Sequence, residues 1–166
     1  SNPMLGWIVR IALETGMRQS ELLGIEWEDI DITRRFIHLS DTKSGDPRDV
    51  PLSPKALLTI QAMPRPIDGG RVFDVTQDRL TRAVPQACKR ARATYAQQHG
   101  QPAPSGWLEG EIVFHTLRHT AATRWAALLA AQALAQALGW NTMQMALRYY
   151  HPTGESLAAK LHAAAA

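Results

Sequence analysis

The segment His115-Thr116-Leu117-Arg118-His119 holds residue types that can handle phosphate. His115 and Arg118 stand three positions apart, so they share one face at the start of a predicted helix. A guanidinium can donate two parallel hydrogen bonds to a phosphate oxyanion, and an imidazole beside it can give or accept a proton. A capping histidine and a surface arginine are the alternative interpretation. The spacing by itself leaves both open.

The same segment could also hold a metal, because His115 and His119 stand four apart on a predicted helix. The metalloprotease version of this pattern needs Glu directly after the first histidine, where this chain has Thr116. We therefore expect no metal site here.

Two further cations lie in predicted turns. Arg18 follows Gly16, which ends the first helix, and Glu21 stands one helical step further on, where it could orient a neighbouring group. A local surface ion pair is the alternative. Lys43 lies in the turn-forming stretch 41–47, between two segments of strand composition.

Near the C-terminus, Leu138-Gly139-Trp140 precedes Arg148-Tyr149-Tyr150-His151-Pro152. Taken in order with the arginine turn, the lysine hairpin loop and the histidine–arginine helix, these motifs resemble the catalytic domain of the tyrosine recombinases, the phage-integrase family. The resemblance covers nearly the whole chain. It implies six catalytic residues, which are Arg18, Lys43, His115, Arg118, Trp140 and Tyr149.

The resemblance also separates the aromatic residues by role. The nucleophile of the family precedes a variable residue and then His, which selects Tyr149 and leaves Tyr150 as its neighbour. Trp140 stands where most members have His; it can donate an indole N–H to a phosphate oxygen but cannot exchange protons. For the three aromatic residues, a packed cluster of side chains is the alternative. Glu21 resembles an acidic residue of the family that hydrogen-bonds the motif histidine, and a glutamate on the helix surface is its alternative.

The implied reaction is attack of the Tyr149 hydroxyl on a DNA phosphodiester, which leaves a 3′-phosphotyrosyl bond and a free 5′-hydroxyl. Arg18 and Arg118 would stabilise the charge of the transition state. Lys43 would protonate the leaving oxygen, and His115 would ease proton removal from the tyrosine. The resemblance implies neither cofactor nor metal.

The function expected from the resemblance is site-specific recombination or integration, with double-stranded DNA as partner and a homotetramer on DNA; the isolated chain could be monomeric. One alternative is a type IB topoisomerase-like enzyme that nicks and religates without exchanging partners. Another is a non-catalytic DNA-binding module of the same fold. The complete set of motif residues argues against the second alternative.

Two features depart from the family pattern. Ala126–Leu138 contains neither Gly nor Pro, although the family usually breaks the helix there, so the turn must fall at residues 130–132 or two helices are fused. In addition, the chain lacks the N-terminal DNA-clamping domain of the family, so residues 1–166 are expected to form one catalytic domain that binds DNA weakly.

These residues must be positioned by a mainly α domain with a small antiparallel sheet (α+β). Hydrophobic periodicity and turn residues predict strands within 30–39 and 48–52. They predict helices over 4–15, from Ser20 to about 28, and over 54–63, 76–99 with a fresh start at Pro85, 116–138, 143–150 and 155–166. The segment 79–92 is the most basic, and it could follow a DNA backbone or be a solvated helix surface.

Composition fits this picture. The 166 residues are 45% hydrophobic and 20% charged, with a net charge of +3, too mild to decide on a polyanionic partner. The single cysteine, Cys88, cannot form an intrachain disulfide, which favours a reducing, cytoplasmic location. No apolar run approaches the length of a membrane span, and we expect no membrane association.

Overall fold

The computed structural model describes residues 3–40, 47–110 and 112–164. In chain order the elements are α1 (Pro3–Thr15), α2 (Gln19–Gly24), a 3-10 turn (Trp27–Asp29), β1 (Ile30–Asp31), β2 (Phe36–Leu39), β3 (Arg48–Pro51), α3 (Pro54–Gln61), α4 (Gln77–His99), α5 (Phe114–Ala126), α6 (Ala131–Leu138), α7 (Met143–Leu147) and α8 (Gly154–Ala164). The expected fold class, mainly α with a small antiparallel sheet, is confirmed.

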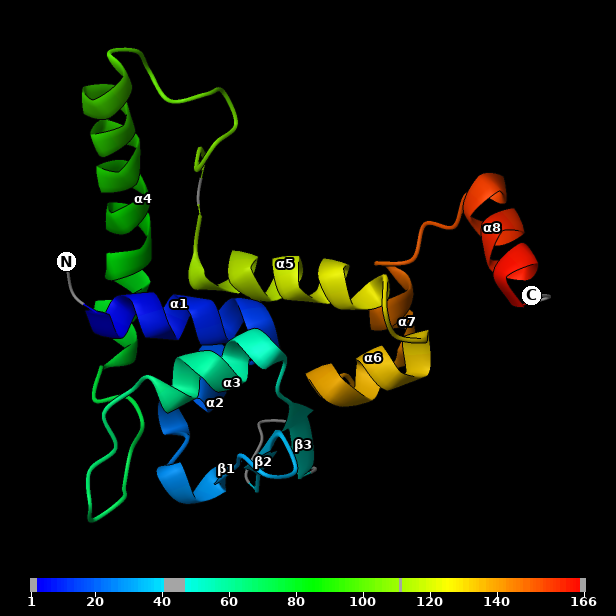
Figure 1. The fold of residues 1–166 in the computed structure, drawn as a ribbon, viewed down its shortest axis with the longest axis horizontal. Helices are drawn as coiled ribbons and strands as arrows, with labels where there is room; N and C mark the ends of the chain where they lie inside the picture. The colour runs from blue at the N-terminus through cyan, green and yellow to red at the C-terminus, as the bar shows by residue number, and fades with distance from the viewer. Residues whose placement is uncertain (1–2, 41–46, 111, 165–166) are drawn as a thin grey trace.

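Helix α1 lies between α5 and α3 and packs against both (Figure 1). Its fully buried residues Ile8, Ile11 and Ala12 recur at helical spacing and face the core. Gly16 then ends α1 with φ +61° and donates its N–H to the carbonyl of Ala12, as the sequence predicts for a C-terminal stop. This turn brings the chain directly to Arg18.

The sheet has the order β1-β2-β3, and both strand pairs are antiparallel. The hairpin between β2 and β3 is confirmed, with Ile37 opposite Val50. The predicted strand 30–39 is interrupted after Asp31 by a tight turn in which Arg35 has φ +66°. The Asp31 side chain stabilises this turn by accepting a hydrogen bond from the backbone N–H of Arg34, 2.7 Å away.

Helix α4 runs without interruption from Gln77 to His99, so the predicted fresh start at Pro85 is wrong. A proline inside a helix removes one hydrogen bond, and here the carbonyl affected belongs to Thr81 on the exposed face. Leu80 and Val84 anchor the other face in the core. Packing therefore keeps the helix continuous through the proline.

The predicted helix 116–138 is two helices, α5 and α6, separated by residues 127–130. The carbonyl of Trp125 accepts the backbone N–H groups of both Leu128 and Leu129, and Ala130 is extended. The expected family break is therefore present, slightly before the predicted 130–132. Burial of Leu134 and Leu138 on α6 fixes the direction of that helix and overrides the helical preference of Ala127 and Ala130 in the break.

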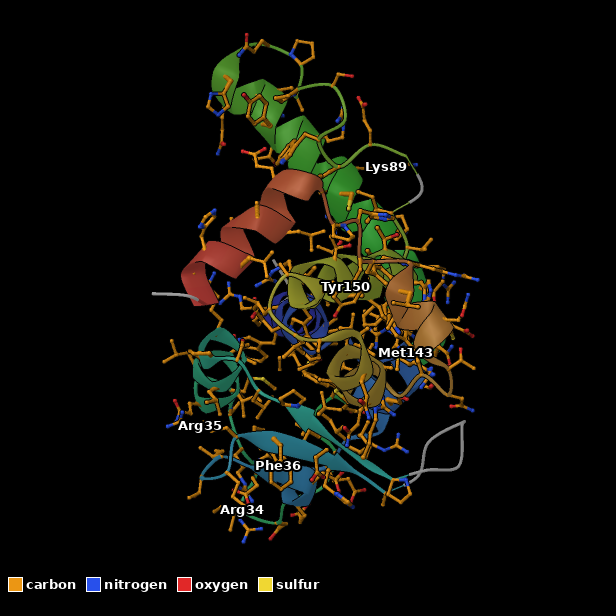
Figure 2. All side chains as sticks on the ribbon, turned by 90° about the vertical axis from the view of Figure 1, so that its right-hand side faces the viewer. Arg34, Arg35, Phe36, Lys89, Met143 and Tyr150 are labelled. Carbon is orange, nitrogen blue, oxygen red and sulfur yellow. The ribbon has the colours of Figure 1, made fainter. Side chains whose placement is uncertain are left out.

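The C-terminal elements are short. Helix α7 ends at Leu147 rather than at Tyr150, after which Tyr149 and Tyr150 donate their N–H groups to the carbonyls of Ala146 and Leu147. Helix α8 stands apart from the body of the molecule (Figure 1). Figure 2 shows Tyr150 in the middle of the molecule, and Met143, which is 49% exposed, at its outer edge on α7.

One core of buried apolar residues joins these elements. It includes Leu22 of α2, Ile37 and Val50 of the sheet, and Leu134 and Leu138 of α6, all at 0% exposure. The side of α6 that carries Leu138 thus lies at the centre of the packing. Two site carbonyls, described next, lie at the C-terminal end of this helix.

Candidate active site

Arg118 is the most deeply placed charge of the site. It lies on α5 and is 4% exposed, and its guanidinium donates to the carbonyls of Gly16, at 2.6 Å, and Leu138, at 2.7 Å. Burial first, and then the charge of Arg18, lower the pKa of Arg118 to about 10. The side chain therefore stays cationic at neutral pH. A guanidinium has five N–H donors, so donors remain for an anion.

Arg18 approaches the same place from the turn between α1 and α2. It donates to the carbonyl of Gly139 at 2.9 Å and to Glu21 at 2.7 Å. The carbonyls of Leu138 and Gly139 are consecutive, so the guanidinium groups of Arg18 and Arg118, 100 positions apart in sequence, converge on one short stretch of backbone. The structure thus brings together the two arginines that the sequence motifs single out.

Glu21 holds two cations at once. One carboxylate oxygen binds Arg18, and the other accepts from Arg48 of β3 at 2.7 Å and from the backbone N–H of Arg18 at 2.8 Å. Burial would raise the pKa of Glu21, but the hydrogen bonds from Arg48 and Arg18 outweigh it and the pKa is lowered. The carboxylate contacts Arg18 rather than a histidine, so it positions the arginine. The backbone contact also makes Arg18, not Ser20, the residue that precedes α2.

Arg48 is a part of the site that the sequence motifs did not indicate. Its side chain is 7% exposed, and its Nη1 atom is buried with no hydrogen-bond partner among the described residues. A Cβ atom at Gly139 would lie 2.7 Å from this Nη1, so the guanidinium packs directly against the glycine. Strand alternation is the signal that could have found it, because Arg48 and the buried Val50 share one face of the sheet.

Gly139 adopts φ +63° at the end of α6, and the chain then turns into Trp140. The indole ring lies 5.5 Å from the guanidinium carbon of Arg118 on one side. It stacks on the Tyr149 ring, with centroids 5.4 Å apart and an interplanar angle of 11°. Trp140 therefore links the buried arginine to the tyrosine.

The two adjacent tyrosines have different surroundings. The hydroxyl of Tyr149 lies 2.5 Å from Nδ1 of His119, whereas the hydroxyl of Tyr150 donates to the backbone carbonyl of Leu129. Burial raises the pKa of Tyr149 by more than the charges of Arg118 and Arg148 lower it. Of the two, only Tyr149 feels the charge of Arg118, and its assignment as the nucleophile stays a prediction.

His115 lies one helical turn before His119 on α5, and the two rings meet edge to face at 4.6 Å. Burial first, and then the charges of His119, Arg118 and Arg18, lower the pKa of His115, so the ring is neutral at neutral pH. From the sequence we expected His115 to ease proton removal from Tyr149. In the structure, the imidazole within hydrogen-bond distance of the Tyr149 hydroxyl is that of His119. Sequence reasoning considered His119 only as a metal ligand.

The remaining expectations concern Lys43 and metal binding. Lys43 lies outside the described residues, so its place in the site stays a prediction. Over residues 3–40, 47–110 and 112–164, no group of three or more His, Cys, Asp or Glu side chains could hold a metal ion. The chemistry available from the described residues is that of guanidinium, imidazole, indole and phenol groups around one surface.

The fold is that of a tyrosine recombinase catalytic domain. The chain belongs to the phage integrase family, whose characteristic sequence pattern matches residues 5–155. It is 37% identical over 164 residues to the shufflon-specific DNA recombinase of Escherichia coli, a match that covers 98% of this chain and 38% of that protein. It is 26% identical over 158 residues to the integrase of Salmonella phage P22, covering 87% of this chain and 38% of that protein.

Solved structures agree on the fold. The catalytic domain of bacteriophage HP1 integrase matches with a TM-score of 0.60 and 27% identity, over 97% of this chain and 82% of that chain. The Tn1549 transposon integrase, solved in complex with transposon right end DNA, matches with a TM-score of 0.68 and 24% identity, over 99% of this chain and 60% of that chain. This chain spans about two fifths of the length of the two curated relatives.

Across the part of the chain that the structure describes, no helix combines the length and the apolar composition needed to cross a bilayer.

Proposed function

We propose that this chain is the catalytic domain of a site-specific DNA recombinase that cleaves and rejoins double-stranded DNA through a 3′-phosphotyrosyl intermediate. One observation carries the proposal: Arg18 and Arg118 reach the neighbouring carbonyls of Gly139 and Leu138, and Trp140, which follows them, stacks on Tyr149. A paired cationic site beside a single phenol suits attack on a phosphodiester. Membership of the phage integrase family supports the same reaction class.

The arginines answer the charge problem of this reaction. Attack by Tyr149 concentrates negative charge on the non-bridging oxygens of phosphorus, and preorganised cations stabilise that charge without reorganising. Arg18 and Arg118 are held in advance by carbonyls and by Glu21. Loss of one preorganised donor in comparable sites raises the barrier by about 3 kcal/mol.

The leaving group needs a proton, because a 5′-alkoxide is strongly basic. Lys43, which stands between β2 and β3 in the sequence, is the proposed donor. Trp140 would add an indole N–H to a phosphate oxygen, as the family resemblance implies, and charge stabilisation there needs no proton exchange. With arginines in the role that metal ions play in many nucleases, the proposed reaction requires no cofactor.

The covalent intermediate retains the energy of the phosphodiester bond. A free 5′-hydroxyl from another strand can therefore attack it and reseal the DNA without an external energy source. This feature supports recombination rather than hydrolysis as the function. The proposed partner is double-stranded DNA; the similar Tn1549 integrase was solved with transposon DNA, and XerH recombinase was solved bound to its difH substrate. A homotetramer on DNA is the assembly we propose from the family resemblance.

The proposal is tested with nicked duplexes that carry a randomised central segment. Cleavage close to the nick leaves a short fragment that carries the free 5′-hydroxyl. This fragment diffuses away, so the strand cannot be resealed and the covalent complex is trapped. We expect the 166-residue chain to yield a denaturation-resistant adduct with a subset of sequences, Tyr149→Phe to yield none, and Tyr150→Phe to retain it. An adduct that survives in Tyr149→Phe and disappears in Tyr150→Phe would overturn the assignment, and so would absence of any adduct.

A second arm separates recombination from simple nicking and closing. The trapped complex is given a new strand that has a free 5′-hydroxyl and is complementary to the exposed part of the uncleaved strand. We expect joined product of a new length. Resealing that occurs only when the released original fragment is added back would instead indicate a topoisomerase-like activity.

A further inference from the structure

The hydroxyl of Tyr149 and the Nδ1 atom of His119 lie 2.5 Å apart, within hydrogen-bond distance. We infer that His119 is the base that takes the phenol proton of Tyr149 during DNA cleavage and returns it during resealing. The inference rests on the proposed function and deepens it, because it assigns the proton to a residue that the sequence motifs leave without a role in this reaction.

Both residues of the His119–Tyr149 contact are held in place by their surroundings. His119 comes from α5, one residue after the buried Arg118, so the backbone that carries it is anchored in the core. Tyr149 is oriented by its stacking on Trp140, and its ring centroid lies 5.9 Å from that of His119. The hydroxyl is thus directed to the imidazole by packing of the ring as well as by the hydrogen bond.

The charges around the phenol explain why a base is needed. Arg118 of α5 and Arg148, next to Tyr149 in the chain, favour the phenolate, but burial outweighs them and the pKa of Tyr149 is raised. At neutral pH the group is therefore a phenol, which is a poor nucleophile. A base within hydrogen-bond distance removes the proton as the oxygen attacks.

The neighbouring histidine supports this assignment to His119. His115 faces the His119 ring from the same helix face, and its pKa is lowered by burial and then by the charges of His119, Arg118 and Arg18. It is neutral at neutral pH and adds no positive charge beside the proton acceptor. Its position leaves it free to donate a hydrogen bond toward the phosphate, as the family resemblance implies.

The proposed step transfers one proton and exchanges one bond at phosphorus. The O–H bond of Tyr149 breaks and its proton passes to Nδ1 of His119, while the phenolic oxygen forms a bond to phosphorus. The bond from phosphorus to the 5′-oxygen breaks, and that oxygen takes a proton from the general acid to leave as a hydroxyl. In the reverse direction the His119 imidazolium protonates the departing phenolate of Tyr149.

The decisive variant is His119→Asn. An asparagine side chain can place a hydrogen-bonding atom near the position of Nδ1, but it cannot accept the proton, so it separates holding the phenol from deprotonating it. The His119 side chain is exposed, so the substitution removes no core packing. His99→Asn, on the distant end of α4, is the matched histidine control.

The measurement is the single-turnover rate of adduct formation on the nicked duplexes selected above, followed from about pH 6 to pH 9. For His119→Asn we expect a rate lower by about 10²-fold or more at pH 7. We also expect the deficit to shrink as the pH rises, because solvent base increasingly replaces the histidine. His99→Asn should match the unsubstituted chain throughout.

Two outcomes would count against the inference, and they differ from failure of the proposed function. If the unsubstituted chain forms the Tyr149 adduct and His119→Asn forms it at a similar rate, His119 only orients the phenol and the inference is wrong. A small deficit that does not change with pH has the same meaning. If the unsubstituted chain forms no adduct, the proposed function itself fails, and the inference falls with it.

Discussion

The two halves of the candidate site are built in opposite ways. The cationic half, formed by Arg18, Glu21, Arg48 and Arg118, is largely buried and tied to the backbone of α6 through carbonyl oxygens. The nucleophile half, Tyr149 and its contacts, follows a short helix of five residues and is held by ring stacking and one hydrogen bond. The cations are part of the core, whereas the tyrosine is attached to it.

This difference has a functional logic. Groups that stabilise charge in a transition state work best when they are fixed before the reaction. In the proposed reaction Tyr149 would become covalently bound to one DNA strand and would have to move with it, which a less extensive attachment to the core allows. The comparison predicts that substitutions in the cationic half lower stability and activity together, while those in the nucleophile half lower activity alone.

The largest loss of stability is expected for Glu21→Gln. The side chain of Glu21 is 4% exposed, and its carboxylate neutralises Arg48, whose side chain is 7% exposed. Removing one partner of a buried ion pair costs about 3–5 kcal/mol, because the other charge stays buried without compensation. Urea unfolding should show this decrease; a change below about 1 kcal/mol would mean that water reaches Arg48 and that the cationic half is not part of the core.

Gly139→Ala should have the next largest effect. The residue has φ +63°, and the added Cβ would lie 2.7 Å from Nη1 and Cζ of Arg48. Backbone strain of this kind costs about 1–3 kcal/mol, and the guanidinium must also shift. We expect lower stability and slower adduct formation. Gly24→Ala, where nothing lies within 4 Å of the added atom, is the matched control. Equal behaviour of the two variants would contradict the close packing of Arg48.

Acid should weaken the cationic half selectively. The folded-state pKa of Glu21 lies below its ordinary value of 4.5, so its contribution to stability is complete above that pH and is lost as the pH falls through the folded pKa. The difference in unfolding free energy between the unsubstituted chain and Glu21→Gln should therefore stay constant from about pH 6 to pH 5 and shrink as the pH falls further to about 3. A difference that stays constant throughout would show that Glu21 is not held as a carboxylate by the arginines.

Tyr149→Phe should have the smallest effect on stability. It removes one hydroxyl at a partly exposed position and leaves the stacked ring in place on Trp140. We expect a change in unfolding free energy within about 1 kcal/mol, the size of one hydrogen bond. A thermal unfolding curve checks this. A large decrease would show that the tyrosine is a structural part of the core.

Much of the site could be predicted because its motifs are local. Arg18, Glu21, His115 and Arg118 follow turns or begin helices that the sequence marks with Gly16 and with helical spacing, and the structure brings them together as expected. The hairpin between β2 and β3 was predicted for the same reason, since turn residues separate two segments of strand composition.

The errors have physical causes that lie beyond local sequence. The break between α5 and α6 depends on the burial of Leu134 and Leu138 against distant elements, which the alanine-rich sequence does not reveal. Pro85 is accommodated because packing keeps α4 continuous around it. Arg48 was missed because a charged residue at the start of a strand gives no sign that Glu21 will bury it, except its alternation with Val50.

The most direct test of the account is mass spectrometric mapping of the peptide that remains linked to DNA after trapping on a nicked duplex. Tyr149 and Tyr150 are adjacent, so fragmentation of that peptide must resolve which of them carries the nucleotide. The account predicts a phosphotyrosyl bond at Tyr149, whose hydroxyl lies on His119 beside the arginines. A bond at Tyr150, whose hydroxyl is directed to the carbonyl of Leu129, would contradict it.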